Sequence, residues 1–218
     1  MTSLSKIPAE EALSAADDPF SITAGASLET ERLILRPARC SDAATIAELA
    51  DDARIASNLG RIPHPYRLKD AEAWISRALA REEGFELVIE SKIDHAVIGA
   101  VGVKRRDLHE PDLVLGFWIG VPYFGRGFGT EAAQGAVDLA FQHLALARLG
   151  ATTRAVNWSS RRVLENCGFQ WIGQGMETSR YMHATVPVDR FVLDRAVWKA
   201  IKSWGARART PCAREVIA

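Results

Sequence analysis

Apolar and polar residues follow two patterns along most of the chain, and together these patterns predict a mixture of strands and helices. Short runs rich in Val, Ile, Leu and aromatic residues predict seven strands. These strands span residues 32–38, 85–91, 96–106, 113–121, 150–156, 169–176 and 189–195. Apolar residues that recur every three or four positions predict four helices. These helices span residues 41–52, 69–83, 129–147 and 159–168.

The order of these elements predicts one mixed α/β domain. A short polar turn, SKID, separates the strands 85–91 and 96–106, and such turns favour antiparallel hairpins. The helix 129–147 connects the strands 113–121 and 150–156, and a helical connection of this kind joins parallel strands. We therefore expect a mostly antiparallel sheet with one parallel pair.

The two ends of the chain lack this periodicity. Residues 1–27 are rich in Ala, Ser, Asp and Glu, and we interpret them as an N-terminal extension. Residues 199–218 are basic, and we interpret them as a solvated C-terminal tail. The predicted domain therefore spans residues 28–198.

Charge and cysteine content restrict the classes of function. Lys plus Arg and Asp plus Glu both number 27, so the formal net charge is zero. An obligate nucleic-acid binder depends on excess basic charge, so we expect no nucleic-acid partner. Cys40, Cys167 and Cys212 form no CxxC pair, which favours a reduced, cytoplasmic setting without a metal site. No apolar run reaches the ~18–20 residues that span a bilayer, so we expect no membrane partner.

Three glycines lie close together in YFGRGFGTEA, residues 123–132, directly before a predicted helix. The first N–H groups of a helix have no partner within it, and small residues let several of them approach one anion. The stretch therefore predicts a phosphate-binding turn, for which three classes of site compete.

Spacing separates these three classes. Gly120, Gly125 and Arg126 match a P-loop, but Gly127 stands where the P-loop has the Ser or Thr that binds magnesium. Gly125, Gly127 and Gly129 form G-x-G-x-G, which is one residue shorter than the dinucleotide fingerprint. The third class is a pyrophosphate turn of the coenzyme A type, in which Gly127 and Gly129 form the Gly-x-Gly step at the helix start.

Four segments between Leu28 and Trp198 occur together in this order: ETERLILRP, IPHPY with DAEAWI, LGFWIGVPYFGRGFGTEA and NWSSRRVLENCGF. With them the sequence resembles the GNAT N-acetyltransferases, and in particular the ribosomal-protein-alanine acetyltransferase-like (RimJ/RimL-type) branch. The resemblance implies a GNAT acyltransferase fold in which the fourth and fifth strands, 113–121 and 150–156, splay apart. It also implies acetyl-CoA as co-substrate and no metal.

The resemblance implies that main-chain groups bind the cofactor. Trp118, Ile119 and Gly120 would pair with the pantetheine like an added strand, and one of their N–H groups would polarise the thioester carbonyl. The pyrophosphate would be held by the amides of Gly125, Arg126, Gly127, Phe128, Gly129 and Thr130. Asn157 and Ser160 match cofactor-contacting positions of the family, and a serine at this point is also a good N-cap.

The resemblance leaves the acid and the base open. Many relatives have a tyrosine acid where this chain has Leu164, and a glutamate in the fourth strand where it has Val114. We expect Ser160 to protonate the leaving thiolate and Glu90 to act as the base, through water. Alternative bases are Asp112, His109 and His64.

The acceptor would enter opposite the cofactor, past residues 58–67 and 176–188, where His64, Tyr66 and Tyr181 are candidate substrate-binding residues. We expect direct acetyl transfer to a primary amine in a ternary complex. The amine belongs to a protein N-terminus or to a small molecule, and a homodimer is compatible with either. Two alternatives remain, a catalytically degenerate acyl-CoA-binding domain with a sensing or scaffold role and a nucleotide hydrolase.

Overall fold

The computed structural model describes residues 27–106, 111 and 113–208, apart from the side chains of residues 205–208. Eight strands in these ranges form one sheet with the order β1-β2-β3-β4-β5-β6-β8-β7. They are β1 (Leu28–Glu29), β2 (Leu33–Arg36), β3 (Gly84–Ser91), β4 (Val97–Arg105), β5 (Leu113–Ile119), β6 (Arg148–Arg154), β7 (Gln170–Ser179) and β8 (Ala184–Asp194). The β5–β6 pair is parallel and the other pairs are antiparallel, which confirms the predicted mixed α/β fold.

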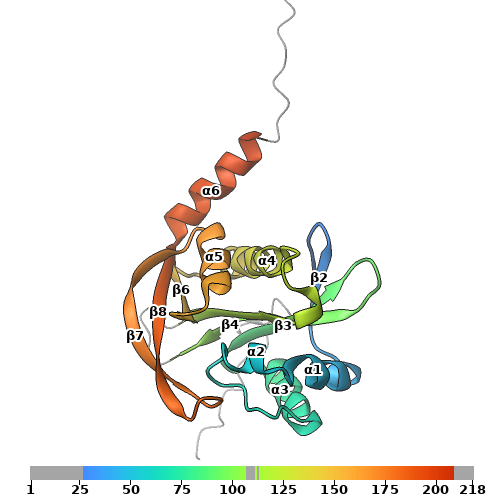
Figure 1. Ribbon diagram of the computed structural model, residues 1–218. Helices are drawn as coiled ribbons and strands as arrows, with labels where there is room; N and C mark the ends of the chain where they lie inside the picture. The colour runs from blue at the N-terminus through green and yellow to red at the C-terminus, as the bar shows by residue number, and fades with distance from the viewer. Residues whose placement is uncertain (1–26, 107–110, 112, 209–218) are drawn as a thin grey trace, which may run out of the picture.

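Helices cover both faces of this sheet (Figure 1). They are α1 (Ala43–Ala50), α2 (Ala53–Ala56), α3 (Leu68–Ala80), α4 (Phe128–His143), α5 (Trp158–Asn166) and α6 (Arg195–Ala208). Helices α1, α2 and α3 lie on one face, which we call the acceptor face, and α4 and α5 lie on the other; α6 projects away from the body (Figure 1). No helix within the described ranges is long and apolar enough to cross a membrane.

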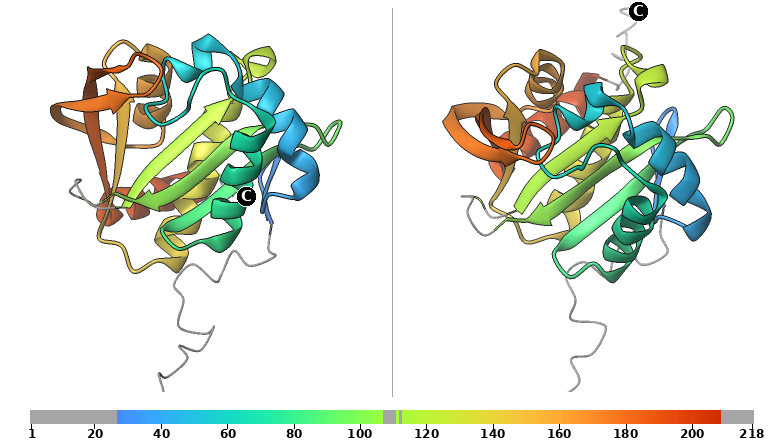
Figure 2. Two further views of the ribbon diagram at one scale, coloured as in Figure 1. Left: turned by 90° about the horizontal axis from the view of Figure 1, so that it is seen from below. Right: turned by 60° about the horizontal axis from the view of Figure 1, so that its bottom comes forward.

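Two apolar cores hold these layers together. The larger core packs α4 and α5 against the sheet, and the helical stripe predicted from the sequence supplies buried residues to it, among them Val137 and Phe141. The smaller core packs α1 and α3 against the acceptor face and includes Ile46, Ile75 and Val88. Seen from below, α1 and α3 lie over one side of the sheet, and the β7–β8 hairpin lies at the opposite side (Figure 2).

The structure has one strand and two helices more than the seven strands and four helices predicted. β1 has two residues and α2 has four, and such short elements show no readable periodicity. The third addition is α6, where we predicted a solvated tail from residue 199 onwards. The Trp198 ring stacks on Phe141 at 5.2 Å between centroids, and Trp198 Nε1 donates to Asp138 at 2.9 Å. These contacts order a helix that continues through the predicted boundary at 198/199.

Candidate functional site

Strands β5 and β6 diverge in the middle of the sheet. Their pairing covers only Val114 with Gly150 and Leu115 with Ala151. On its other side β5 stays paired with β4 as far as Ile119. The β5 main chain from Gly116 onwards therefore has no strand partner on the β6 side among the described residues. An extended ligand can add to such an edge as a further strand.

The glycine turn, residues Phe124–Gly127, leads directly from this edge into α4. Gly125 has φ +74° and Gly127, the N-cap of α4, has φ +79°. This left-handed conformation favours glycine because a Cβ would collide with the backbone. The first helical hydrogen bond runs from Glu131 N–H to the Gly127 carbonyl at 3.1 Å. The preceding N–H groups at the start of α4 thus have no partner within the helix, and the helix dipole is positive there.

A polar clamp fixes the glycine turn to the β1–β2 hairpin. Glu131 in the first turn of α4 accepts hydrogen bonds from the Thr30 hydroxyl at 2.6 Å and from Arg32 N–H and Nε at 2.7 Å each. Arg32 Nη1 also donates to the Arg126 carbonyl at 3.0 Å. Burial opposes ionisation of Glu131, but the hydrogen bonds from Thr30 and Arg32 outweigh it and hold its pKa below the usual value. The sequence analysis did not identify Thr30, Arg32 or Glu131. The one feature that pointed to this clamp is the acidic residue in the first turn of α4, a position where acids stabilise a helix.

Asn157 organises the start of α5. Its Oδ1 accepts the Ser160 N–H at 3.1 Å and the Ser159 hydroxyl at 2.9 Å, so Asn157 is the N-cap of this helix. The expectation that Ser160 could cap the helix was wrong, because Ser160 lies in the first turn. The Ser160 side chain is half-buried, and its hydroxyl has no partner in the part of the chain that the structure describes.

Two other residues near this helix belong to the larger core. Leu164, at the position of the family tyrosine, is buried in it. Cys167 is buried there as well, and burial raises the pKa of its thiol to about 12. A thiol with such a pKa stays protonated at neutral pH and is a poor nucleophile. Both side chains are therefore packing residues.

Glu90 is engaged on both of its carboxylate oxygens. Arg36 Nε lies 2.5 Å from Oε2, and His95 Nδ1 lies 2.8 Å from Oε1. Arg36 also forms a bidentate pair with the buried Asp42. Burial raises the pKa of Glu90, but the hydrogen bonds from Arg36 and His95 outweigh this and lower it overall. A general base needs a pKa near the working pH, so this environment disfavours the predicted role of Glu90 and favours a structural one.

The structure brings two of the three predicted substrate-binding residues together. The rings of His64 and Tyr181 lie 5.5 Å apart between centroids. His64 Nδ1 is 3.2 Å from Asp51 Oδ1, which also accepts the Tyr66 N–H at 2.7 Å. Tyr66 itself is buried in the smaller core, where burial raises its pKa to about 12. Tyr66 thus supports the loop from within. The alternative bases His109 and Asp112 lie outside the described residues.

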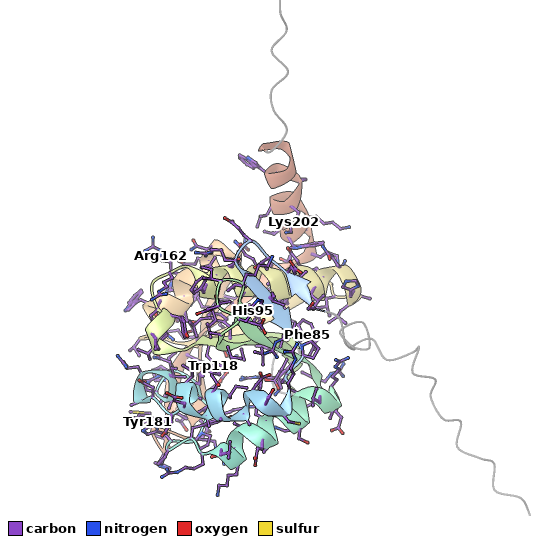
Figure 3. All side chains as sticks on the ribbon, turned by 90° about the vertical axis from the view of Figure 1, so that its right-hand side faces the viewer. Phe85, His95, Trp118, Arg162, Tyr181 and Lys202 are labelled. Atoms are coloured by element: carbon purple, nitrogen blue, oxygen red, sulfur yellow. The ribbon has the colours of Figure 1, made fainter. Side chains whose placement is uncertain are left out.

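The loop after α2 and the β7–β8 hairpin meet on the acceptor face. The Arg180 N–H donates to the Gly60 carbonyl at 2.9 Å, which joins the loop to the end of β7. In Figure 3, Trp118 and Tyr181 lie on the same side of the sheet as α1 and α3. Trp118 packs against the smaller core at the end of β5. Tertiary contacts therefore bring His64, Tyr181 and the β5 edge to one face, although they are far apart in the sequence.

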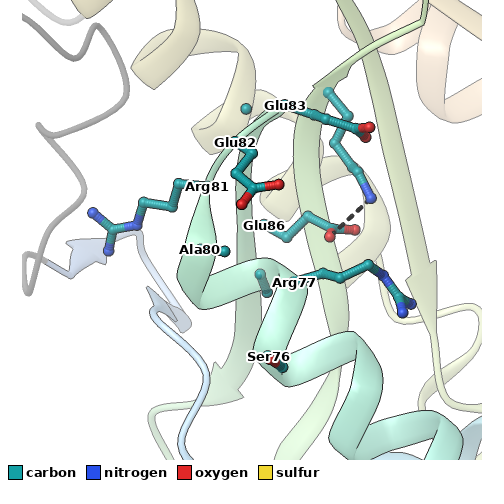
Figure 4. A pocket seen from close by; sticks show the side chains of 10 residues that line it. Ser76, Arg77, Ala80, Arg81, Glu82, Glu83 and Glu86 are labelled. Atoms are coloured by element: carbon teal, nitrogen blue, oxygen red, sulfur yellow. Dashed lines mark hydrogen bonds and ion pairs between the residues drawn. The ribbon is translucent and has the colours of Figure 1, made fainter. Parts of the chain in front are cut away.

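A separate cavity of about 270 Å³ lies at the C-terminal end of α3 (Figure 4). Its charged lining residues are Arg77, Arg81, Glu82, Glu83, Glu86 and Lys104. Lys104 and Glu86 pair at 3.0 Å, and the three basic residues match the three acidic ones. The cavity does not include the glycine turn or the free edge of β5.

The free β5 edge beside a glycine turn at a helix N-terminus is the geometry that the family resemblance implies. The Acetyltransferase (GNAT) domain family matches residues 32–170. The chain belongs to the GNAT acetyltransferase family. It is therefore an acyltransferase with the N-acetyltransferase activity of this family.

Known proteins resemble this chain in sequence and in fold. The uncharacterized N-acetyltransferase p20 of Bacillus licheniformis is 27% identical over 146 residues, 66% of this chain and 82% of its own length. The ribosomal-protein-S5-alanine acetyltransferase of Vibrio fischeri has the same fold, with a TM-score of 0.67, 21% identity, and coverage of 79% of this chain and 98% of its own. RimJ of Mycobacterium smegmatis, in complex with CoA-disulfide, has a TM-score of 0.66, 20% identity, and coverage of 79% and 89%.

Proposed function

We propose that this GNAT protein transfers acetyl from acetyl-CoA directly to a primary amine within a ternary complex. The observation that carries this proposal is the divergence of β5 and β6 after Leu115 and Ala151, directly beside the N-terminus of α4. The divergence offers a main-chain edge to an extended ligand, and the helix start offers N–H groups to an anion. Pantetheine and pyrophosphate are such a pair of groups within one molecule.

The proposed cofactor site uses main-chain groups on both sides of this divergence. Pantetheine pairs with Trp118, Ile119 and Gly120, and the Asn157 amide NH₂ donates to it while Asn157 Oδ1 caps α5. The pyrophosphate accepts hydrogen bonds from the amides of Gly125, Arg126, Gly127, Phe128, Gly129 and Thr130. The Arg32–Arg126 contact holds the turn in place before the ligand arrives. Preorganisation of this kind reduces the ordering cost of binding.

The proposed chemistry is a single acyl transfer. The neutral amine nitrogen attacks the thioester carbonyl, and a β5 main-chain N–H donates to the oxygen that becomes negative. The C–S bond then breaks, the sulfur leaves as a thiolate, and the amine nitrogen loses one proton to a base. Ser160 donates a hydrogen bond to the thiolate and passes it a proton from solvent, which leaves the serine hydroxyl unchanged; its unpaired hydroxyl at the start of α5 suits this role.

We propose His64 as the base in place of Glu90. Glu90 is held ionised by Arg36 and His95, so it accepts a proton poorly at neutral pH. His64 is bound to Asp51 through Nδ1, and this contact orients the ring and leaves Nε2 for the acceptor amine. The loop that carries His64 and the hairpin that carries Tyr181 border the acceptor face, where the amine enters.

Ligand stabilisation and thiol release test the proposal together. A ligand that binds only the native state increases the free energy of unfolding, by about 2.7 kcal/mol at 100 times its Kd. The melting temperature rises as a result. We expect acetyl-CoA and CoA to stabilise the protein and Mg-ATP to leave it unchanged. Free thiol should then appear when amines are added. Stabilisation by ATP alone would contradict the cofactor assignment, and stabilisation by acetyl-CoA without turnover of any amine would favour an acyl-CoA-binding sensor or scaffold.

A further inference from the structure

Two arginines whose side chains reach the acceptor face, Arg106 and Arg154, have no role in the proposed acetyl transfer. Gly116, in the middle of β5, is exposed, and a Cβ added there would meet no heavy atom within 4 Å. Gly116 lies directly after the last β5 residue that pairs with β6, so this open space borders the point where the strands diverge. Arg106 follows β4 and pairs with Glu177, Arg154 lies on β6 and contacts the Ser57 carbonyl, and Arg61 lies in the loop after α2, near enough to repel Arg106.

The contact between Arg106 and Glu177 shows that the sheet curls. In the strand order, β7 lies four positions from β4, and strands spaced ~4.8 Å apart would separate them by about 19 Å in a flat sheet. Yet Arg106, next to the end of β4, pairs with Glu177 of β7 at 3.3 Å. Burial is the largest cause that lowers the pKa of Arg106; the charge of Glu177 raises it, and the repulsion of Arg61 lowers it further. The Arg106 guanidinium is therefore largely removed from water beside the Glu177 carboxylate.

The second observation is the position of the Arg154 side chain, which has a buried Nε that is unpaired within the described part of the chain. Leu149 and Ala151 face the larger core, so Gly150, Thr152 and Arg154, which alternate with them along β6, all point to the acceptor face. Arg154 Nη1 donates to the Ser57 carbonyl at 2.9 Å, which confirms that the side chain lies on this face next to α2. Its Nε is buried and has no hydrogen-bond partner among the described residues. An unpaired guanidinium N–H in a buried position costs free energy, and an anion would remove this cost.

The structure assigns this arrangement to an acceptor that carries a carboxylate close to its amine. Among the described residues, the three arginines outnumber Glu177, the acid that pairs with Arg106, whereas the cavity in Figure 4 has equal numbers of both signs. Guanidinium groups bind carboxylates through paired, charge-assisted hydrogen bonds. Arg154 and Arg106 bind the carboxylate while the amine points to the thioester. This inference rests on the proposed acetyl transfer, and the carboxylate belongs either to a free amino acid or to an acidic residue near a peptide N-terminus.

Matched acceptors test the assignment and separate the two sources. Alanine is compared with alaninamide, and amidated peptides with aspartate in the second position are compared with the same peptides carrying asparagine. We expect kcat/KM at least 10-fold higher for the acid of the preferred pair than for its amide. The same pairs are also tested for thermal stabilisation of the CoA-loaded protein, which needs no turnover.

The variants Arg154→Gln and Arg106→Gln should abolish this preference by raising KM for the acid at least 10-fold. The KM for the amide and the stabilisation by CoA should stay unchanged. Arg154→Lys, which keeps the charge without the paired donors, should retain part of the preference if a variant with glutamine folds poorly. Arg148→Gln is the matched control, because Arg148 lies on the same strand but is exposed and pairs with Asp194.

The two readouts distinguish failure of this inference from failure of the proposed function. Equal kcat/KM and equal stabilisation for acid and amide would overturn the carboxylate assignment while leaving acetyl transfer intact. Stabilisation by the acids that Arg154→Gln removes, without thiol release from any amine, would keep the anion site and refute the transferase function. The inference is also overturned if none of the acids binds, whether it is a free amino acid or a peptide.

Discussion

The α4–α5 side of the sheet and the acceptor face differ in what builds their sites. On the α4–α5 side, the proposed cofactor contacts are mostly main-chain groups from one continuous stretch, residues 118–130, with Asn157 and Ser160 from the next helix. On the acceptor face, the candidate groups are side chains from separate segments, namely His64 after α2, Arg106 after β4, Arg154 on β6 and Glu177 and Tyr181 around the hairpin.

This difference has consequences for specificity and for mutation. Main-chain donors persist when most side chains change, provided that the backbone keeps its shape, so one cofactor suits many related sequences. Side chains on loops and hairpins change singly, and each change alters the acceptor that fits. We therefore expect substitutions of glycines to impair cofactor binding most, and substitutions of charged side chains to change the use of the acceptor most.

Gly127→Val should have the largest effect. A β-branched residue is strained at φ +79°, and its Cβ would lie 3.4 Å from Arg32 Nη2. We expect CoA affinity to fall by about 100-fold or more, seen as loss of the CoA-dependent thermal shift. Gly173→Val is the control, because Gly173 also has positive φ (+142°) but lies in β7 with open space around it. A normal CoA shift in Gly127→Val would show that the turn does not hold the cofactor.

His64→Gln should mainly affect the chemical step. Removal of a general base costs about 100-fold in many enzymes, and we expect kcat to fall by about this factor while the CoA-dependent thermal shift stays the same. His143→Gln removes an exposed histidine at the end of α4 and serves as the control. If kcat is retained in His64→Gln, the base must be sought elsewhere on the acceptor face.

Glu90→Gln should lower stability rather than activity. The buried carboxylate loses charged hydrogen bonds, at a cost of about 2 kcal/mol, or roughly 30-fold in the folding equilibrium. Because the folded-state pKa is lowered, this contribution is present above the unfolded pKa of about 4.3 and is lost as pH falls through the folded pKa. Denaturant unfolding should therefore show a large difference between variant and wild type at pH 7 and a smaller one at acidic pH. A large fall in kcat in the folded variant would instead restore Glu90 as a base.

Ser160→Ala should have the smallest effect. A thiol is a much stronger acid than an alcohol, with a pKa of about 8.5 for cysteine, so a thiolate leaves tolerably without an acid. We expect kcat to fall about 10-fold near pH 7, with a smaller loss above pH 8.5. Ser159→Ala is the matched control, since the Ser159 hydroxyl donates to Asn157. A loss that is independent of pH, or equal in both variants, would argue against proton donation by Ser160.

The predictability of the two regions follows the same division. The apolar stripe of α4 and the strand β5 could be predicted from the sequence because their periodicity is local. The glycine turn could be predicted because its backbone conformation requires glycine. The Arg32–Glu131 clamp and the Arg36–Glu90 pair could not be predicted from the sequence. Their partners lie 99 and 54 residues apart in sequence, and only the packed sheet brings them together.

The sequence by itself determined the mixed α/β fold, the parallel connection through α4 and the position of the glycine turn, because these depend on local periodicity and backbone conformation. Only the tertiary structure decided that Arg36 and His95 hold Glu90 ionised, that Tyr66 is buried and that Trp198 orders α6. It also decided that the sheet curls until Arg106 meets Glu177. Burial and charge pairing are properties of the assembled chain, because they depend on which distant segments exclude water together.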